Sequence, residues 1–164
     1  MSGDNVLPPI TRIASNTGAP RFAALPAWCR DWVGISYADG ANGPDAYDCY
    51  HYMAAIQRTV YRLTPPVFPG AFPELPGESR RDDARRVAEA IDLRKTVEWL
   101  PIDAPEPGAA VLLRWPVKAC HCGVVVTAEP PIMLHIHRGV EAHPARLDQP
   151  PWSRRVVGFY RYVG

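Results

Sequence analysis

The hydrophobic period of the chain changes once, and this change limits the folds that the chain can adopt. From Cys49 to Leu63, apolar residues recur at three- and four-residue steps, which predicts a helix over 49–63. From residue 96 onward, the pattern is one of short β-rich runs bounded by proline, glycine or acidic turns: TVEWL, GAAVLLRW, CHCGVVVTA, PIMLHIH and RRVVGFYRY. Helices first and strands afterwards predict an α+β fold with an antiparallel sheet.

The remaining segments divide the chain into an extension and one domain. Residues 1–24 are rich in Pro, Gly, Ser and Asn without a sustained period, so we expect an N-terminal extension that could serve as a docking segment. Residues 25–164 then form a single domain, which is long enough to bury a core. A proline-rich loop at 64–78 separates the first helix from a second one, which Ser79 would cap and which ends near Lys95.

Composition and charge argue against several classes of protein. The formal net charge of +1 gives no support for nucleic acid as the main partner. No apolar run approaches the ~20 residues of a membrane span, and the first residues lack the pattern of a secretory signal peptide. The chain has four cysteines, but a domain with its own core needs no disulfide, so we expect free thiols.

Cys49 follows an acidic residue and begins the predicted helix. A helix N-terminus lowers the pKa of a thiol, and an adjacent imidazole lowers it further, which would make Cys49 a nucleophile. The alternative is a buried structural cysteine, because free cysteines are among the most buried residue types.

The histidines favour the nucleophile. His121 and His135 lie on consecutive strand-like runs joined by TAEPP, so in an antiparallel hairpin their imidazoles can be neighbours on one face. One imidazole could take the proton from Cys49 and the other could orient it. His137 would share a face with His135 and is the alternative for this third role. His143, in the segment EAHPAR, is expected to be solvated.

The segment Cys-His-Cys at 120–122 suggests a zinc site, but strand geometry opposes one. Successive residues of a strand point to opposite faces, so Cys120, His121 and Cys122 cannot converge on one ion. Cysteine ligands of zinc are usually separated by about two to four residues. We therefore predict no metal site, although His135 and His137 could in principle contribute to one.

Together these motifs resemble those of the NlpC/P60 cysteine peptidases, which are papain-like peptidoglycan hydrolases. WVGISY is similar to the family's Trp-x-Gly-x-x-Tyr opening, and DGANGPDAYDC is similar to its Gly-rich turn before Asp-Cys. Tyr37 stands twelve residues before Cys49, the spacing that the family shows between its active-site tyrosine and its cysteine. PGAAVLL, HCGVVV and MLHIH resemble three later elements, and the resemblance covers most of 28–162.

The resemblance implies a role for each candidate residue. Cys49 would be the nucleophile, His121 the base and His135 the orienting third residue. Tyr37 and the backbone N–H of Cys49 would form the oxyanion or substrate-binding site, and Asp48 would help to hold the free amine of a stem peptide. The family typically cleaves D-γ-glutamyl-diaminopimelate bonds or nearby amides in peptidoglycan, and we expect no cofactor.

Two positions depart from the family pattern. Tyr50-His51 follows Asp-Cys where the family usually has Ser-Gly, and a bulky Tyr50 would reshape or narrow the substrate subsite. Ala109 replaces an aspartate that is structural in the family. These departures leave two alternatives open: a catalytically silent component with the same fold, and an amidase or acyltransferase on the same scaffold.

The C-terminal part carries a narrower resemblance. MLHIHRGVEAHPARLD and WSRRVVGFYRYV are similar to segments of the tail-associated peptidases of phages and gene transfer agents. This implies an enzyme of the virion tail tip, made in the host cytoplasm and acting in the host periplasm and cell wall. Tail hub or distal tail proteins would be its partners, with residues 1–24 and 64–78 as docking segments. The silent alternative is then a structural tail-tip component.

Overall fold

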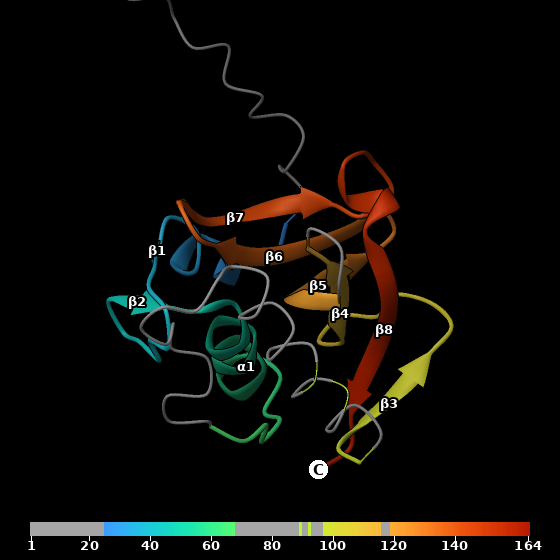
Figure 1. Cartoon of the computed structure of the whole chain (residues 1–164), viewed down its shortest axis with the longest axis horizontal. Coiled ribbons are helices and arrows are strands. Elements are labelled where there is room, and N and C mark those ends of the chain that lie inside the picture. Colours follow the sequence, from blue (N-terminus) through green and yellow to red (C-terminus); the bar gives the residue numbers. More distant parts are fainter. Residues whose placement is uncertain (1–24, 68–88, 90–91, 93–96, 116–118) are drawn as a thin grey trace, which may run out of the picture.

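Figure 1 shows the chain as a computed structural model, which describes residues 25–67, 89, 92, 97–115 and 119–164. A short 3-10 helix, η2 (Ala27–Asp31), is followed by β1 (Ser36–Tyr37), β2 (Ala46–Tyr47) and the helix α1 (Cys49–Thr59). The rest is mainly strand: β3 (Trp99–Ile102), β4 (Ala110–Arg114), β5 (Ala119–Ala128), β6 (Pro131–His137), β7 (Val140–Arg146), η3 (Trp152–Arg154) and β8 (Val156–Tyr162). The predicted extension over 1–24 lies outside the described residues.

Six of the strands form one antiparallel sheet, as the sequence pattern predicts. Its order is β3-β8-β4-β5-β6-β7, so β5 and β6 lie in the interior and β7 forms one edge. The helix α1 packs on one face of the sheet against β5 and β6 (Figure 1). The α+β fold class is confirmed, and the packing brings the first residue of α1 to the strands that carry the histidines.

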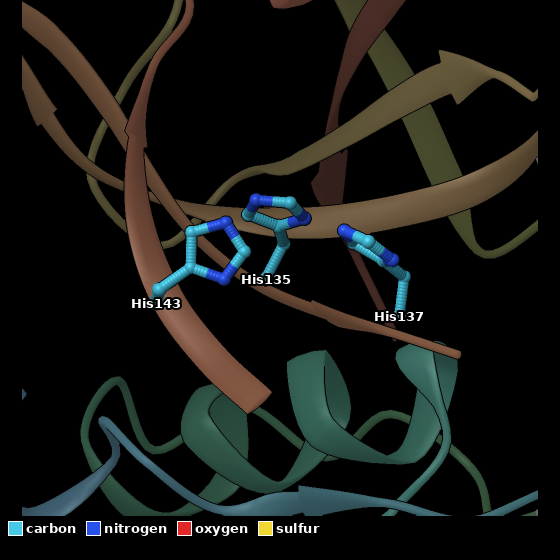
Figure 2. A group of neighbouring side chains, drawn as sticks. All are labelled: His135, His137 and His143. Carbon is cyan, nitrogen blue, oxygen red and sulfur yellow. The ribbon is translucent and has the colours of Figure 1, made fainter. Parts of the chain in front are cut away.

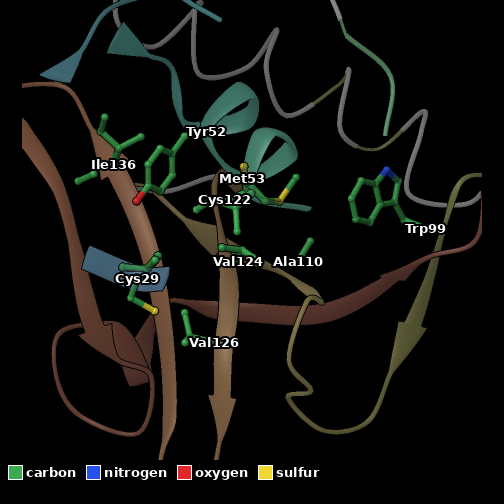
Figure 3. Packing of buried hydrophobic residues seen from close by; sticks show 12 residues of the cluster. Cys29, Tyr52, Met53, Trp99, Ala110, Cys122, Val124, Val126 and Ile136 are labelled. Carbon is green, nitrogen blue, oxygen red and sulfur yellow. The ribbon is translucent and has the colours of Figure 1, made fainter. Parts of the chain in front are cut away.

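The main core lies between α1 and the sheet (Figure 3). Tyr52, Met53 and Ile56 form the apolar face of α1 and are buried to 2% exposure or less. They meet alternate residues of the central strands: Cys122, Val124 and Val126 of β5, and Leu134 and Ile136 of β6. A second cluster on the opposite face includes Val111, Val125 and Met133. The central strands are therefore buried on both faces.

The helix α1 begins where the sequence predicts and ends one turn early. Asp48 is its N-cap, and a carboxylate oxygen of Asp48 accepts a hydrogen bond from the backbone N–H of His51 at 2.8 Å. The apolar period predicts a helix as far as Leu63, but regular helix stops at Thr59. Arg62 adopts a left-handed backbone conformation with φ of 58°, which the helix cannot accommodate.

The sequence pattern predicts no strand over 140–146, yet β7 occupies this segment. The reason is its position at the sheet edge. Pro144 cannot donate a ladder hydrogen bond, and an edge strand tolerates this because one side of it needs no partner. The strand pairs with β6 and sets His143 directly opposite His135.

Several other expectations concern residues that are only partly described. The predicted second helix lies almost entirely outside the described residues, and Glu89 and Asp92 within it are helical. Cys29, Cys49 and Cys122, whose side chains are described, are free thiols, as expected. Within the described ranges, no helix has the length and apolar character needed to cross a membrane.

Candidate active site

Cys49 is the first residue of α1 and lies half-buried between the helix and the sheet. A hydrogen bond with Cys122 is the largest influence on its pKa and lowers it. Burial acts in the opposite direction, and a hydrogen bond with His121 and the charge of His121 lower the pKa again. The net effect lowers the pKa of Cys49 from 9.0 to about 5, against the opposing charge of Asp48. Cys49 is therefore a thiolate at neutral pH, the form that acts as a nucleophile.

His121 and His135 face each other across the β5–β6 pair. The Nε2 atom of His121 lies 3.1 Å from the Nδ1 atom of His135, and both side chains are buried. Since Nε2 of His121 is directed at His135, its Nδ1 atom is the nitrogen left for Cys49. Burial, followed by the charges of His121, His143 and His137, holds the pKa of His135 well below its usual value. His135 is thus a neutral partner for a base that must gain and lose a proton.

His137, the alternative third residue, has a different environment. Its ring lies 6.0 Å from the ring of His121, centroid to centroid, and its Nδ1 atom is 3.3 Å from the carbonyl oxygen of Arg138. The structure therefore brings His135, rather than His137, within hydrogen-bond distance of His121.

Gly123 allows the two histidine-bearing strands to approach. A Cβ atom at this position would lie 2.9 Å from the carbonyl oxygen of Leu134 and 3.1 Å from Cβ of His135. The first of these contacts is with backbone, so the strand would have to shift to relieve it. A glycine two residues after His121 is thus required by the close approach of β6.

Tyr37, on β1, lies close enough to Cys49 for the two to influence each other electrostatically. Burial is the main cause that raises the pKa of Tyr37, and the charge of Cys49 adds to it, so the phenol stays protonated. Its hydroxyl donates to Asp39 at 2.7 Å, and Arg138 donates to the same carboxylate oxygen at 2.7 Å. Tyr37 therefore keeps its proton near the thiolate and donates it to Asp39 in this structure.

Asp48 is buried beside Cys49, and both of its carboxylate oxygens are occupied. One accepts from the backbone N–H of His51 and the other lies 2.8 Å from the Nδ1 atom of the same histidine. In this structure the side chain caps α1. Its predicted part in holding a substrate amine stays a prediction.

Three features of the site are absent from the sequence prediction. The hydrogen bond of Cys122 to Cys49 is one, and the contact of His51 with Asp48 is another. The third is a correction: the sequence predicts a solvated His143, but this residue is half-buried, with its ring centroid 4.3 Å from that of His135. Because β7 was not predicted, the strand pairing that places His143 there could not be foreseen.

An aromatic frame surrounds the histidines. The ring of Trp152 lies 4.4 Å from the ring of His135, and the ring of Trp115 lies 5.8 Å from the ring of His121. The guanidinium of Arg155 lies over Trp115 at 4.3 Å from its centroid. These rings restrict the rotation of the His121 and His135 imidazoles, and such restriction is what a positioned base requires.

No protein-family model matches the chain, and no curated protein matches it. Solved structures do. A protein of the NLP/P60 family described as similar to lipoprotein, from Staphylococcus aureus, superposes with a TM-score of 0.53 and 14% identity over 82% of this chain. NlpC1 from Trichomonas vaginalis gives 0.53 and 21% over 81%, and an NlpC/P60 family protein from Bacillus cereus gives 0.53 and 13% over 85%.

The aligned region is a minor part of each of these proteins. It spans 38%, 41% and 41% of their respective chains. At these identities the likeness concerns the fold, which the sequence motifs also indicate. The chain therefore has the papain-like α+β fold of the NlpC/P60 proteins.

Proposed function

We propose that the chain is a cysteine peptidase that hydrolyses amide bonds in the stem peptides of peptidoglycan. The observation that carries this proposal is the arrangement of three side chains: His121 lies close enough to Cys49 to lower the pKa of its thiol, and the Nε2 atom of His121 lies 3.1 Å from Nδ1 of His135. It provides a thiolate nucleophile, a base beside it and a neutral residue that orients the base, which are the three parts of a cysteine–histidine mechanism.

The proposed reaction proceeds through an acyl-enzyme. The Cys49 thiolate attacks the carbonyl carbon, and the oxyanion accepts hydrogen bonds from the backbone N–H of Cys49 and from the hydroxyl of Tyr37, which turns from Asp39 to donate its one proton to the oxyanion. The N–H of the first helical residue suits this role because it has no acceptor within the helix. His121 then protonates the leaving amine as the C–N bond breaks. His121 then takes a proton from water, and the resulting hydroxide attacks the thioester, which releases the carboxylic acid and restores the Cys49 thiolate beside protonated His121.

The proposed substrate class is supported by the likeness of the fold to that of NlpC/P60 proteins and by the sequence motifs. Tyr37, Asp39 and Arg138 lie on the side of Cys49 formed by β1 and the β6–β7 turn, and they offer polar groups to a peptide backbone. Tyr50 is turned to the loop after α1, where its hydroxyl donates to the carbonyl oxygen of Pro66 at 2.8 Å. This hydrogen bond supports an active site in which Tyr50 narrows the substrate subsite but leaves the Cys49 thiol accessible.

The proposed setting is the tip of a virion tail, acting in the periplasm and cell wall of the host. It rests on the resemblance of the C-terminal segments to tail-associated peptidases. Residues 1–24 and the loop at 64–78 would dock onto tail hub or distal tail proteins. Co-purification of the chain with a recombinant tail hub protein, compared with a chain lacking residues 1–24, tests this part separately.

Digestion of purified peptidoglycan, followed by mass analysis of the fragments, tests the activity. We expect the wild type to release cut stem peptides and Cys49→Ala to release none. Cys29→Ala is the matched control, because burial raises the pKa of Cys29 to about 11 and keeps that thiol unreactive. The masses identify the bond and distinguish a peptidase from an amidase. A folded wild type that cuts nothing would favour the silent structural component, and Tyr50→Ser would then be the first variant to make.

A further inference from the structure

We propose that His135, His137 and His143 bind a divalent transition-metal ion such as Zn²⁺, and that the bound ion inactivates the Cys49–His121 pair. The binding site stands on the geometry of the three histidines alone. The inhibitory effect on hydrolysis rests on the proposed function.

The three rings gather on one face of the β6–β7 pair (Figure 2). One ring nitrogen from each residue lies within 4.8 Å of the other two. A tetrahedral zinc ion with Zn–N bonds of about 2.0–2.1 Å needs its nitrogens about 3.3 Å apart, so each pair must approach by at most about 1.5 Å. His137 and His143 are half-buried, so side-chain rotation can supply this movement without a backbone change.

Two of the histidines are already oriented as metal ligands usually are. The Nδ1 atom of His143 lies 2.8 Å from the carbonyl oxygen of Glu141, and that of His137 lies 3.3 Å from the carbonyl oxygen of Arg138. A carbonyl oxygen only accepts, so Nδ1 carries the proton in both rings and Nε2 keeps its lone pair. A backbone carbonyl that fixes the tautomer in this way is the usual outer partner of a metal-bound histidine.

A separate observation on His135 also points to a bound ion. The residue is fully buried, and its Nε2 atom has no hydrogen-bond partner among the described residues. A buried polar atom without a partner is costly and uncommon. A metal ion between the rings would provide that partner.

The donor set selects the kind of metal. Three imidazoles suit Zn²⁺, Ni²⁺ or Cu²⁺, whereas Mg²⁺ and Ca²⁺ prefer oxygen ligands. The nearby guanidinium of Arg155 opposes a cation electrostatically. We therefore expect a moderate affinity for the metal ion, which suits a regulatory site that binds and releases the ion reversibly. A water molecule would be the fourth ligand of the ion.

Metal binding and catalysis make incompatible demands on His135. A protonated His121 donates its Nε2–H to Nδ1 of His135, so the proton of neutral His135 must reside on Nε2. An ion on Nε2 moves that proton to Nδ1, where it opposes the N–H of His121. An ion on Nδ1 displaces His121 directly. Either arrangement removes the hydrogen bond between Nε2 of His121 and Nδ1 of His135, so the base beside Cys49 loses the residue that orients it.

Binding is measured by calorimetry and by the visible spectrum of added Co²⁺, on the full chain. Wild type and Cys49→Ala should each bind one equivalent through nitrogen ligands, without a sulfur-to-cobalt charge-transfer band. His143→Ala should bind at least tenfold more weakly. Loss of binding in Cys49→Ala, a sulfur band, or unchanged affinity in His143→Ala would each overturn the site.

Inhibition is measured separately through the rate at which iodoacetamide alkylates Cys49. Zn²⁺ at a concentration that just saturates the wild type should slow this alkylation at least tenfold in the wild type and far less in His143→Ala. Equal rates for the two proteins without metal would show that His143→Ala is folded. Binding without an effect on alkylation would refute the coupling. Because neither readout uses peptidoglycan, a failure of the proposed peptidase function would leave these results interpretable.

Discussion

The hydrogen bond between Cys122 and Cys49 leads to a quantitative prediction about the nucleophile. This bond is the largest cause of the lowered pKa of Cys49, ahead of the contributions of His121. A hydrogen bond to a charged group contributes about 1.5–3 kcal/mol, and a thiol is a weak donor, so the lower end applies. One pKa unit corresponds to about 1.4 kcal/mol. Cys122→Ala should therefore raise the pKa of Cys49 by about one unit, from about 5 to about 6.

The assay is the pH profile of Cys49 alkylation by iodoacetamide, followed by mass analysis of the peptide that carries it. At about pH 5, half of the wild-type thiol is ionised and about a tenth of the variant thiol, so the variant should react about fivefold more slowly. At about pH 8 both thiols are fully ionised and the rates should agree. Cys122→Ser retains a donor and is the matched control, whose midpoint should stay close to that of the wild type.

Two results would refute this reasoning. If the midpoint of Cys122→Ala coincides with that of the wild type, the hydrogen bond does not stabilise the thiolate. If Cys122→Ser and Cys122→Ala shift equally, a packing change rather than the lost donor is responsible. Cys122 is 7% exposed within the core, so thermal unfolding of both variants accompanies the profiles.

Three further predictions concern the residues around Cys49. Gly123→Ala should lower peptidoglycan hydrolysis at least tenfold, because its Cβ would push β6 and His135 away from His121. Gly158→Ala is the control and should not lower it, because the atoms nearest to its added Cβ belong to the Tyr160 side chain, at 3.2 Å or more. Tyr37→Phe should lower kcat about 10²-fold with little change in KM if its hydroxyl stabilises the oxyanion, and equal kcat would exclude that role. Burial keeps His135 neutral in the folded chain, whereas in the unfolded chain it takes up a proton below a pKa of about 6.5, so the free energy of unfolding falls as the pH drops below that value. Chemical denaturation at about pH 7 and about pH 5 should show a smaller loss of this free energy for His135→Asn than for the wild type.

Much of the fold is accessible from the sequence because local patterns agree with the tertiary structure. The helical period from Cys49 onward reflects a single apolar face, with Tyr52, Met53 and Ile56 buried against the sheet. The β-rich runs become strands with small changes at their ends. The neighbouring positions of His121 and His135 follow from one expected hairpin, which the β5–β6 pairing confirms.

The features that were missed depend on contacts between distant segments. A proline and alternating polar residues hide β7 from any local pattern, and only its pairing with β6 places His143 beside His135. The bond from Cys122 to Cys49 depends on how α1 lies across β5, and no spacing within the chain predicts this. A search for pairs of histidines on adjacent strands would have included His143 if edge strands with proline had been allowed.

The position of Asp48 creates an electrostatic conflict that His51 relieves. Asp48 caps the helix whose N-terminus favours the thiolate, but its own negative charge raises the pKa of Cys49. His51 donates to one carboxylate oxygen through its backbone N–H, and its Nδ1 atom, 2.8 Å from the other, can donate there as well. Two such hydrogen bonds draw the negative charge toward His51 and away from the thiol. This role explains why a fully buried histidine stands at the position where the family usually has glycine. The contact of His51 with Asp48 is therefore compatible with the lowered pKa of Cys49.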